Sequence, residues 1–290
     1  MKRLDKSEII FKVLAYVLLI LFSICCIYPL IYVVSVSVSD MDMVNNGKVI
    51  LWPRGFQLEA FKDVVIGQYA KSFWTSYCNT VFFTVYGTLV SMIVAITGAY
   101  ALSKSRLMFR RGFNFMLVFT MWFSAGMIPT YRNFQNLGID NKYGYIIGLG
   151  FNAFNMILLR NFFQGIPSEI EEAATIDGAT EFQLLTKIYM PMSKTSIVTV
   201  TMFFALSRWN GWFWAQLILN DEKDWPLQLI MRNMLENLTD TDVQGAGDAK
   251  YAPSSGQFAM IICSIIPICV VYPQMQKYFA AGVNVGGVKE

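Results

Sequence analysis

Long apolar stretches dominate the chain, and shorter polar segments separate them. A helix needs about 20 mostly apolar residues to cross a bilayer. Because no water is present in hydrocarbon, each such stretch must satisfy its own backbone polar groups, which favours a helix. The pattern predicts an all-α polytopic membrane protein, a single transmembrane domain over residues 1–290. Six transmembrane helices are expected, at 12–38, 74–102, 113–131, 144–163, 195–219 and 256–280.

Basic residues in the connections predict the orientation of these spans. The connection KSRLMFRR, residues 104–111, carries four positive charges, and short loops of this kind stay on the cytoplasmic side. The alternation of sides then places both termini and the segment 165–194 in the cytoplasm, and makes 220–253 an extracellular loop. The first span is expected to be retained, because its apolar run is longer than the core of a signal peptide.

Composition supports a membrane protein and disfavours several other classes. Hydrophobic residues make up 55% of the 290 residues and charged residues 15%, outside the usual range of a soluble domain. Histidine is absent and the five cysteines show no CxxC spacing, so neither a metal site nor a disulfide framework is expected. The sequence contains no GxxxxGK[ST] loop for a nucleotide, and its dispersed net charge of +3 disfavours nucleic acid.

The polar segment between the fourth and fifth spans has local signals for two short helices. Four acidic side chains exclude it from hydrocarbon. Ser168 and Glu171 have the spacing of a capping box that begins the first helix, and Thr180 and Gln183 repeat this spacing for the second. Gly178 lies between the two helices and suits the left-handed backbone on which a helix often ends. The sequence therefore predicts two helices joined by a bend.

The faces of these two helices are suited to contact with another protein. Two adjacent alanines make one face of the first helix thin, and Phe182, Leu185 and Tyr189 share one side of the second. A solvated loop has no need for such large apolar groups. Helices that lie on lipid would favour basic residues, whereas the first helix is acidic, and acidic residues also disfavour a DNA-reading helix pair. We therefore predict a docking segment for a cytoplasmic protein.

The same segment resembles the EAA-loop signature of binding-protein-dependent ABC importer permeases, E-A-A-x3-G-x9-I-x-L-P. The chain matches it at every specified position except one, where Met190 replaces the leucine with an apolar side chain of similar volume. The resemblance implies that separate ATPase subunits bind here. The residues expected to contact or orient them are Glu172, Ala173, Ala174, Asp177, Gly178, Phe182, Ile188 and Pro191.

The resemblance covers nearly the whole chain, including RWNGW at 208–212 and the tail that begins YPQMQK. The chain resembles most the second permease of carbohydrate importers, of the maltose-permease-like type that takes up oligosaccharides or aldouronates. The resemblance implies a type I importer permease fold in a bacterial cell membrane, a heterodimer with a second permease, two ATPase subunits that bind ATP and magnesium, and an extracellular sugar-binding protein. This chain is then expected to be no enzyme, with no cofactor, metal or catalytic residue, and to import an oligosaccharide by alternating access.

Polar and aromatic residues within the spans are candidates for the path of the sugar, since sugars stack on aromatic rings and hydrogen-bond through their hydroxyls. Arg208 and Trp212 are four residues apart, the spacing of a cation–π pair on a helix. An aromatic belt at the membrane interface and polar contacts between helices are alternatives, and in the maltose system the partner permease carries the sugar site. The candidates are Trp122, Tyr131, Asn152, Asn155, Arg208, Trp209, Asn210 and Trp212.

The last extracellular loop contains apolar residues at helical spacing over 227–238. This pattern predicts an amphipathic helix with an exposed apolar face that contacts the sugar-binding protein, while 239–253 is expected to be a flexible tether. A helix that lies flat on the outer leaflet is the alternative. The contact candidates are Leu227, Ile230, Met231 and Met234.

Two other classes of function are weighed against an importer permease. An ion-coupled secondary carrier usually has ionisable side chains near the membrane midplane, whereas carboxylates here are confined to loops and the ends of spans. A membrane-embedded enzyme needs a nucleophile, base or metal set within the spans. With no histidine and no intramembrane carboxylate, the sequence disfavours both.

Overall fold

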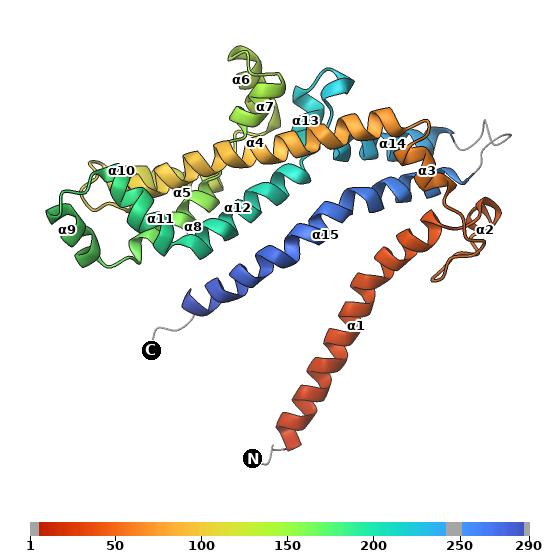
Figure 1. The fold of residues 1–290 in the computed structure, drawn as a ribbon, viewed down its shortest axis with the longest axis horizontal. Helices are drawn as coiled ribbons and strands as arrows, with labels where there is room; N and C mark the ends of the chain where they lie inside the picture. The colour runs from red at the N-terminus through yellow and green to blue at the C-terminus, as the bar shows by residue number, and fades with distance from the viewer. Residues whose placement is uncertain (1–5, 242–250, 287–290) are drawn as a thin grey trace. The chain divides into compact units, whose positions relative to one another are not determined.

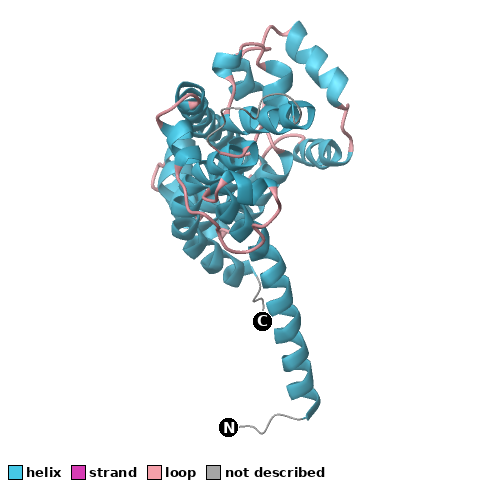
Figure 2. Ribbon diagram, turned by 90° about the vertical axis from the view of Figure 1, so that its right-hand side faces the viewer, coloured by secondary structure: helices cyan, strands magenta, loops and turns pink. Residues whose placement is uncertain are grey.

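A computed structural model describes residues 6–241 and 251–286, and every regular element within these ranges is a helix (Figures 1 and 2). The all-α prediction is confirmed for these residues. Contacts divide the chain into two compact units. The first unit contains residues 1–74 and 233–266, and the second contains 75–232 and 267–290.

The first unit is built around the long amino-terminal helix α1 (Lys6–Ser37). Its apolar side chains are exposed along most of its length, as expected for a helix that faces lipid or another subunit. Two short helices follow, α2 (Met41–Asn45) and α3 (Glu59–Val65), and the first part of α15 (Pro253–Gly286) completes the unit. The Ser255 hydroxyl donates to the Val36 carbonyl at 3.0 Å and joins the start of α15 to the end of α1.

The second unit begins within the 34-residue helix α4 and contains two apolar cores. One core surrounds Ala99, Leu159 and Val200, and the other surrounds Phe83 and Ile218. Helix α8 packs against both α5 and α12. The helices are α4 (Ala70–Ser103), α5 (Arg110–Trp122), α6 (Met127–Asn136), α7 (Lys142–Gly148), α8 (Ala153–Gln164), α9 (Ser168–Ile176), α10 (Glu181–Gln183), the π-helix η1 (Leu184–Tyr189), α11 (Met190–Met192), α12 (Lys194–Trp209), α13 (Phe213–Ile218), the 3-10 helix η2 (Glu222–Asp224) and α14 (Leu227–Thr241).

Several of the predicted spans are interrupted. In the part of the chain that the structure describes, helices α1, α4 and α15 are long and apolar enough to cross a membrane, and two bent pairs raise the number to five if each counts as one span. Helices α5 and α6 meet at 119°, and α7 and α8 at 45°. Each of the predicted spans 113–131 and 144–163 is therefore a bent pair of helices and not one continuous helix. Gly126 has a φ of 88° in the first break, and Asn152 begins α8 after the second by accepting from the Asn155 amide.

The predicted span 195–219 is also divided, so six spans are not confirmed. Helix α12 ends at Trp209 after 16 residues, about 24 Å at 1.5 Å per residue and less than the thickness of a bilayer core. The chain becomes helical again at Phe213. Gly211 in the break lies against the Tyr145 hydroxyl, which would be only 2.8 Å from a Cβ at this position.

Candidate functional site

The segment 165–194, the coupling segment, has the predicted bend. Helix α9 ends at Ile176, Gly178 has a φ of 81°, and α10 begins at Glu181. The capping box of Thr180 and Gln183 is confirmed in both directions. The backbone at Gly178 is left-handed, a conformation that glycine adopts without the steric cost other residues meet.

The capping box predicted for the first helix is wrong. Helix α9 already includes Ser168, and Pro167 occupies the cap position without a side-chain hydrogen bond. Glu171 turns away from the helix start, because its carboxylate binds Lys104 and Tyr189 instead. The Glu171 carboxylate thus binds Lys104, which is distant in the sequence, and not the backbone N–H at the start of α9 that the capping-box pattern predicted.

Most signature residues of the coupling segment are accessible for contact. Helix α9 and the bend are mostly exposed, while Ala174 and Ile188 are partly buried. Two large apolar side chains near the bend are also exposed, Ile176 at 86% and Phe182 at 73%. The sequence interpretation missed Ile176, although an isoleucine beside an acidic helix end is a usable signal. The exposed signature residues are Glu172, Ala173, Asp177, Gly178, Phe182 and Pro191.

The predicted apolar face of the second helix is only partly available. Phe182 is exposed, but Leu185 and Tyr189 are 9% and 4% exposed and belong to the core. The reason is the π-helix η1, which replaces a regular helix over Leu184–Tyr189 and changes which side chains share a face. A docking surface here therefore consists of Phe182 with α9, and excludes Leu185 and Tyr189.

A buried ionic cluster fastens the coupling segment to the end of α4. Lys104 Nζ lies 2.7 Å from Glu171 Oε1, and the Tyr189 hydroxyl donates to Glu171 Oε2 at 2.5 Å. The ammonium also lies 4.3 Å from the ring centre of Tyr100 and 4.0 Å from that of Tyr189. Lys104 is only 7% exposed, so this charge is held by one carboxylate and two aromatic faces.

The cluster keeps Glu171 ionised. Burial alone raises the pKa of Glu171, but the hydrogen bonds from Lys104 and Tyr189 outweigh burial and hold this pKa below its usual range. Burial and the hydrogen bond to Glu171 both raise the pKa of Tyr189, so the phenol stays protonated as a donor. At the exposed edge, Glu181 accepts from the Tyr100 hydroxyl at 2.7 Å and forms an ion pair with Arg106.

A groove of about 750 Å³ lies beside this cluster. Arg106 and Arg110 line one part of it, and Glu172 and Ile176 of α9 line another. The groove combines both signs of charge with an exposed apolar side chain, which suits a protein surface better than a small neutral ligand.

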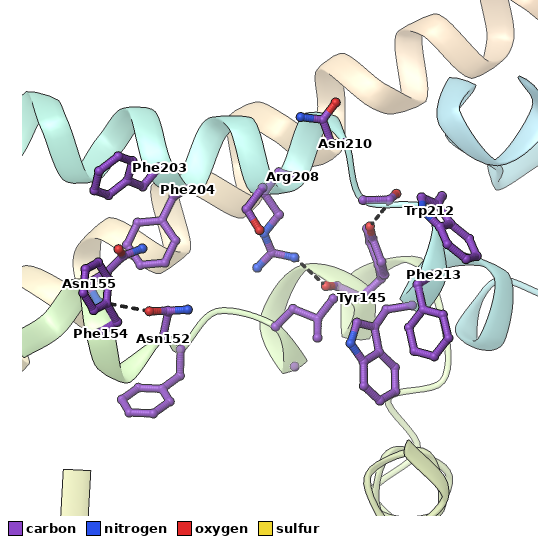
Figure 3. Close-up of a pocket in the computed structure, with 16 residues that line it drawn as sticks. Tyr145, Asn152, Phe154, Asn155, Phe203, Phe204, Arg208, Asn210, Trp212 and Phe213 are labelled. Atoms are coloured by element: carbon purple, nitrogen blue, oxygen red, sulfur yellow. Dashed lines mark hydrogen bonds between the residues drawn. The ribbon is translucent and has the colours of Figure 1, made fainter. Parts of the chain in front are cut away.

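A second hollow, a cavity of about 690 Å³, lies among α7, α8, α12 and α13. Figure 3 shows aromatic side chains around it, with polar groups between them. Sugar-sized ligands need this mixture of ring faces and hydrogen-bonding groups. The lining residues are Tyr145, Gly148, Leu149, Phe151, Asn152, Phe154, Asn155, Phe203, Phe204, Ser207, Arg208, Asn210, Gly211, Trp212, Phe213 and Trp214.

Arg208 contributes to this cavity mainly by supporting its wall. The guanidinium donates to the Tyr145 carbonyl at 3.1 Å (Figure 3) and to the Ile146 carbonyl at 3.1 Å, both near the carboxyl end of α7. The predicted cation–π pair with Trp212 is wrong, because α12 ends between the two residues and they are not on adjacent helical turns. Trp212 is paired with Arg232 instead, whose guanidinium carbon lies 3.7 Å from the ring centre.

The other path candidates divide into two groups. Asn152, Asn155, Asn210 and Trp212 line the cavity with Arg208. The structure does not bring Trp122, Tyr131 or Trp209 to it: Trp122 is 88% exposed at the end of α5, Tyr131 lies on α6, and Trp209 packs on Tyr77 with ring centres 6.0 Å apart. The sequence interpretation missed Phe154 and Phe203, because a phenylalanine in an apolar span is indistinguishable from a core residue.

The four contact candidates of helix α14 do not form the exposed apolar face that was predicted. Leu227 is fully buried and Met231 is 9% exposed, while Ile230 and Met234 are partly buried. The start of this helix is bound to α4, where the Leu227 amide donates to the Thr80 hydroxyl at 2.8 Å. Contact with a binding protein by these four residues stays a prediction, without the exposed patch that motivated it. Most of the predicted tether 239–253 lies outside the described residues.

Among residues 6–241 and 251–286, no group of three or more metal-ligating side chains could hold a metal ion. The cavity and the groove therefore offer binding surfaces, hydrogen bonds and charge, but within that part of the chain no assembled metal centre.

Comparisons with known proteins give a consistent result. The family described as "Binding-protein-dependent transport system inner membrane component" matches residues 2–285. The polygalacturonan/rhamnogalacturonan transport system permease protein YtcP of Bacillus subtilis is 37% identical over 97% of this chain and 98% of its own. The arabinooligosaccharides transport system permease protein AraQ of Halalkalibacterium halodurans is 26% identical over 91% of each chain. A crystal structure of a bacterial ABC transporter involved in the import of the acidic polysaccharide alginate is similar with a TM-score of 0.88 and 42% identity, over 96% of this chain and 100% of that one.

Proposed function

The chain belongs to the family of binding-protein-dependent transport system inner membrane components, and on this premise we propose that it imports an oligosaccharide into the cytoplasm by alternating access. It is a membrane permease subunit of an ABC importer and works with ATPase and substrate-binding partners. A transport subunit of this kind performs no covalent chemistry. In the proposal, ATP and magnesium are bound by two partner ATPase subunits, and this chain carries no cofactor.

The observation that carries the carbohydrate part of the proposal is the lining of the 690 Å³ cavity. Phe154, Phe203 and Trp212 contribute aromatic rings to this lining, and Asn152 and Asn210 contribute amide groups. Aromatic faces attract the apolar C–H faces of sugar rings, and amides pair with hydroxyls. Relatives named for the transport of polygalacturonan and rhamnogalacturonan, of arabinooligosaccharides and of alginate support a carbohydrate substrate.

The coupling segment supports a cytoplasmic ATPase as the source of energy. Its acidic helix α9, the left-handed bend at Gly178 and the exposed Phe182 together present one charged and apolar surface. We propose that Glu172, Ala173, Ala174, Asp177, Gly178, Phe182, Ile188 and Pro191 contact or shape the contact with that ATPase. In this arrangement both termini are cytoplasmic, and a second, different permease completes the translocation path.

Uptake into proteoliposomes tests the proposal. The complex purified through this chain is reconstituted with ATP enclosed and its binding protein outside, and is offered labelled oligogalacturonides, alginate oligosaccharides, arabinooligosaccharides and glutamate. We expect uptake of at least one oligosaccharide class that requires hydrolysable ATP and the binding protein. Uptake without ATP that collapses with a proton or sodium ionophore would instead indicate an ion-coupled carrier, and uptake of glutamate alone would exclude a carbohydrate importer.

A further inference from the structure

The Lys104–Glu171 ion pair joins two parts of the second unit with different expected roles. Glu171 lies on α9 of the coupling segment, and Lys104 directly follows the last residue of α4. The pair is shielded, since the exposed fractions of the two side chains are 8% and 22%. An ion pair in this setting is held more firmly than a solvated one, because loss of either partner leaves a charge in a poorly hydrated place.

The contacts around the pair make the attachment specific. Tyr189 lies in the second half of the coupling segment, and its hydroxyl donates to the same carboxylate at 2.5 Å. The rings of Tyr100 and Tyr189 meet edge to face, with their centres 5.0 Å apart, and both contact the lysine ammonium. The end of α4, helix α9 and the π-helix η1 therefore all contact the Lys104 ammonium or its carboxylate partner. A movement of α9 relative to α4 would break these contacts.

Helix α4 continues without a break from this cluster to Arg208, a residue that lines the cavity. Tyr100 lies near its end, and Gly87 lies thirteen residues earlier, about 20 Å away along the helix axis. At Gly87 the backbone of α4 lies so close to Arg208 that an added Cβ would be 2.9 Å from its Nε. Ser91 lies one helical turn after Gly87, and its hydroxyl accepts from the same guanidinium at 3.4 Å. Arg208 in turn holds the carboxyl end of α7, which lines the cavity.

We propose that Lys104 and Glu171 are a positioning pair that transmits movement of the coupling segment to α4, and through α4 and Arg208 to the cavity. The proposal rests on the proposed function, because it assumes that ATPase subunits move the coupling segment. Glu171 is assigned a different role from Glu172. Glu172 is exposed and in the proposed function contacts the ATPase, whereas Glu171 binds Lys104 of this chain.

The test uses the full complex in nanodiscs and a reporter in the cavity. Ser207 is exposed and lines the cavity, so Ser207→Cys provides a thiol whose maleimide labelling is followed by peptide mass spectrometry, which separates it from the five native cysteines. Labelling rates are compared with and without a nonhydrolysable ATP analogue. The variants Glu171→Gln, Lys104→Met and Tyr189→Phe are each combined with this reporter. Glu169→Gln is the matched control, because Glu169 is an exposed acidic residue of the same helix.

We expect the nucleotide-dependent change in labelling to fall by about threefold or more in Glu171→Gln and Lys104→Met, while the ATPase subunits stay bound in both. The exchange Lys104→Glu with Glu171→Lys should restore part of the change. Tyr189→Phe keeps the packed ring and removes only the hydroxyl, so it should show a smaller loss even if the charge variants fold poorly.

Failure of the positioning pair and failure of the proposed function give different results. A nucleotide response that stays at the wild-type size in Glu171→Gln and Tyr189→Phe, or falls equally in Glu169→Gln, overturns the positioning pair and leaves the proposed function intact. ATPase subunits that do not purify with the wild-type chain overturn the proposed function, and this inference with it.

Discussion

Replacement of Gly178 should weaken the binding of the ATPase subunits through the backbone alone. Gly178 has a φ of 81°, and a Cβ added there would meet no atom within 4 Å. A Cβ at this position therefore has free space in this chain beyond its two neighbours, and its cost within the chain is that of a left-handed backbone, about 1–2 kcal/mol for an ordinary residue. A β-branched residue is expected to cost more than alanine.

The size of the effect follows from this strain. Since 1.4 kcal/mol corresponds to a factor of ten, a cost of about 1–2 kcal/mol lowers the population of the bent form by up to about 5- to 30-fold. If the ATPase binds only the bent form, its apparent affinity falls by the same factor. Gly178→Asn is the matched control, because asparagine tolerates the left-handed conformation better than other side chains.

Titration of the purified permease pair in nanodiscs with isolated ATPase subunits measures this affinity. The expected order of binding is glycine, then asparagine, then alanine, then valine. Wild-type affinity in Gly178→Val would refute the reasoning. Equal weakening by asparagine and valine would also refute it, because the added side chain rather than the backbone conformation would then be responsible.

Three further predictions concern charged residues. Glu172→Lys should reduce the amount of ATPase that purifies with the chain, whereas Glu169→Lys on the same helix should not; equal retention in both would make Glu172 a solvated residue. Arg208→Met should lower the thermal midpoint far more than Ser91→Ala, because each buried carbonyl left without a donor costs about 1–3 kcal/mol; equal midpoints would contradict this. Glu171→Gln should lower the thermal midpoint at pH 7, and its difference from wild type should shrink below pH 4.5. The pKa of Glu171 is depressed in the folded protein, so its carboxylate stabilises the fold above the ordinary pKa of a glutamate, and this stability is lost as pH falls through the folded-state pKa. A difference that persists in acid would argue against the ion pair.

Local signals in the sequence determined the secondary structure class and the bend of the coupling segment. The apolar runs are long enough to require helices, and this requirement depends only on neighbouring residues. The capping box of Thr180 and Gln183 and the left-handed glycine at 178 involve residues within one or two turns, so their spacing could be interpreted directly. The signature of the coupling segment belongs to the same class of short-range pattern.

Tertiary contacts decided the features that local spacing predicted wrongly. Glu171 has the spacing of a cap, but Lys104 and Tyr189 reach its carboxylate and the cap does not form. Arg208 has the spacing of a pair with Trp212, but its guanidinium binds carbonyls 62 and 63 residues away in the chain.

The sequence by itself thus determined where helices form and which loop carries the docking signature, because those depend on near neighbours. Only the tertiary structure decided which charged groups are buried, which apolar faces remain exposed, and where long spans break. A buried charge takes the partner that the fold brings to it, and an apolar helix face such as that of α14 is covered by whichever element packs on it. Neither depends on a repeat within the chain, so no periodicity could have revealed it.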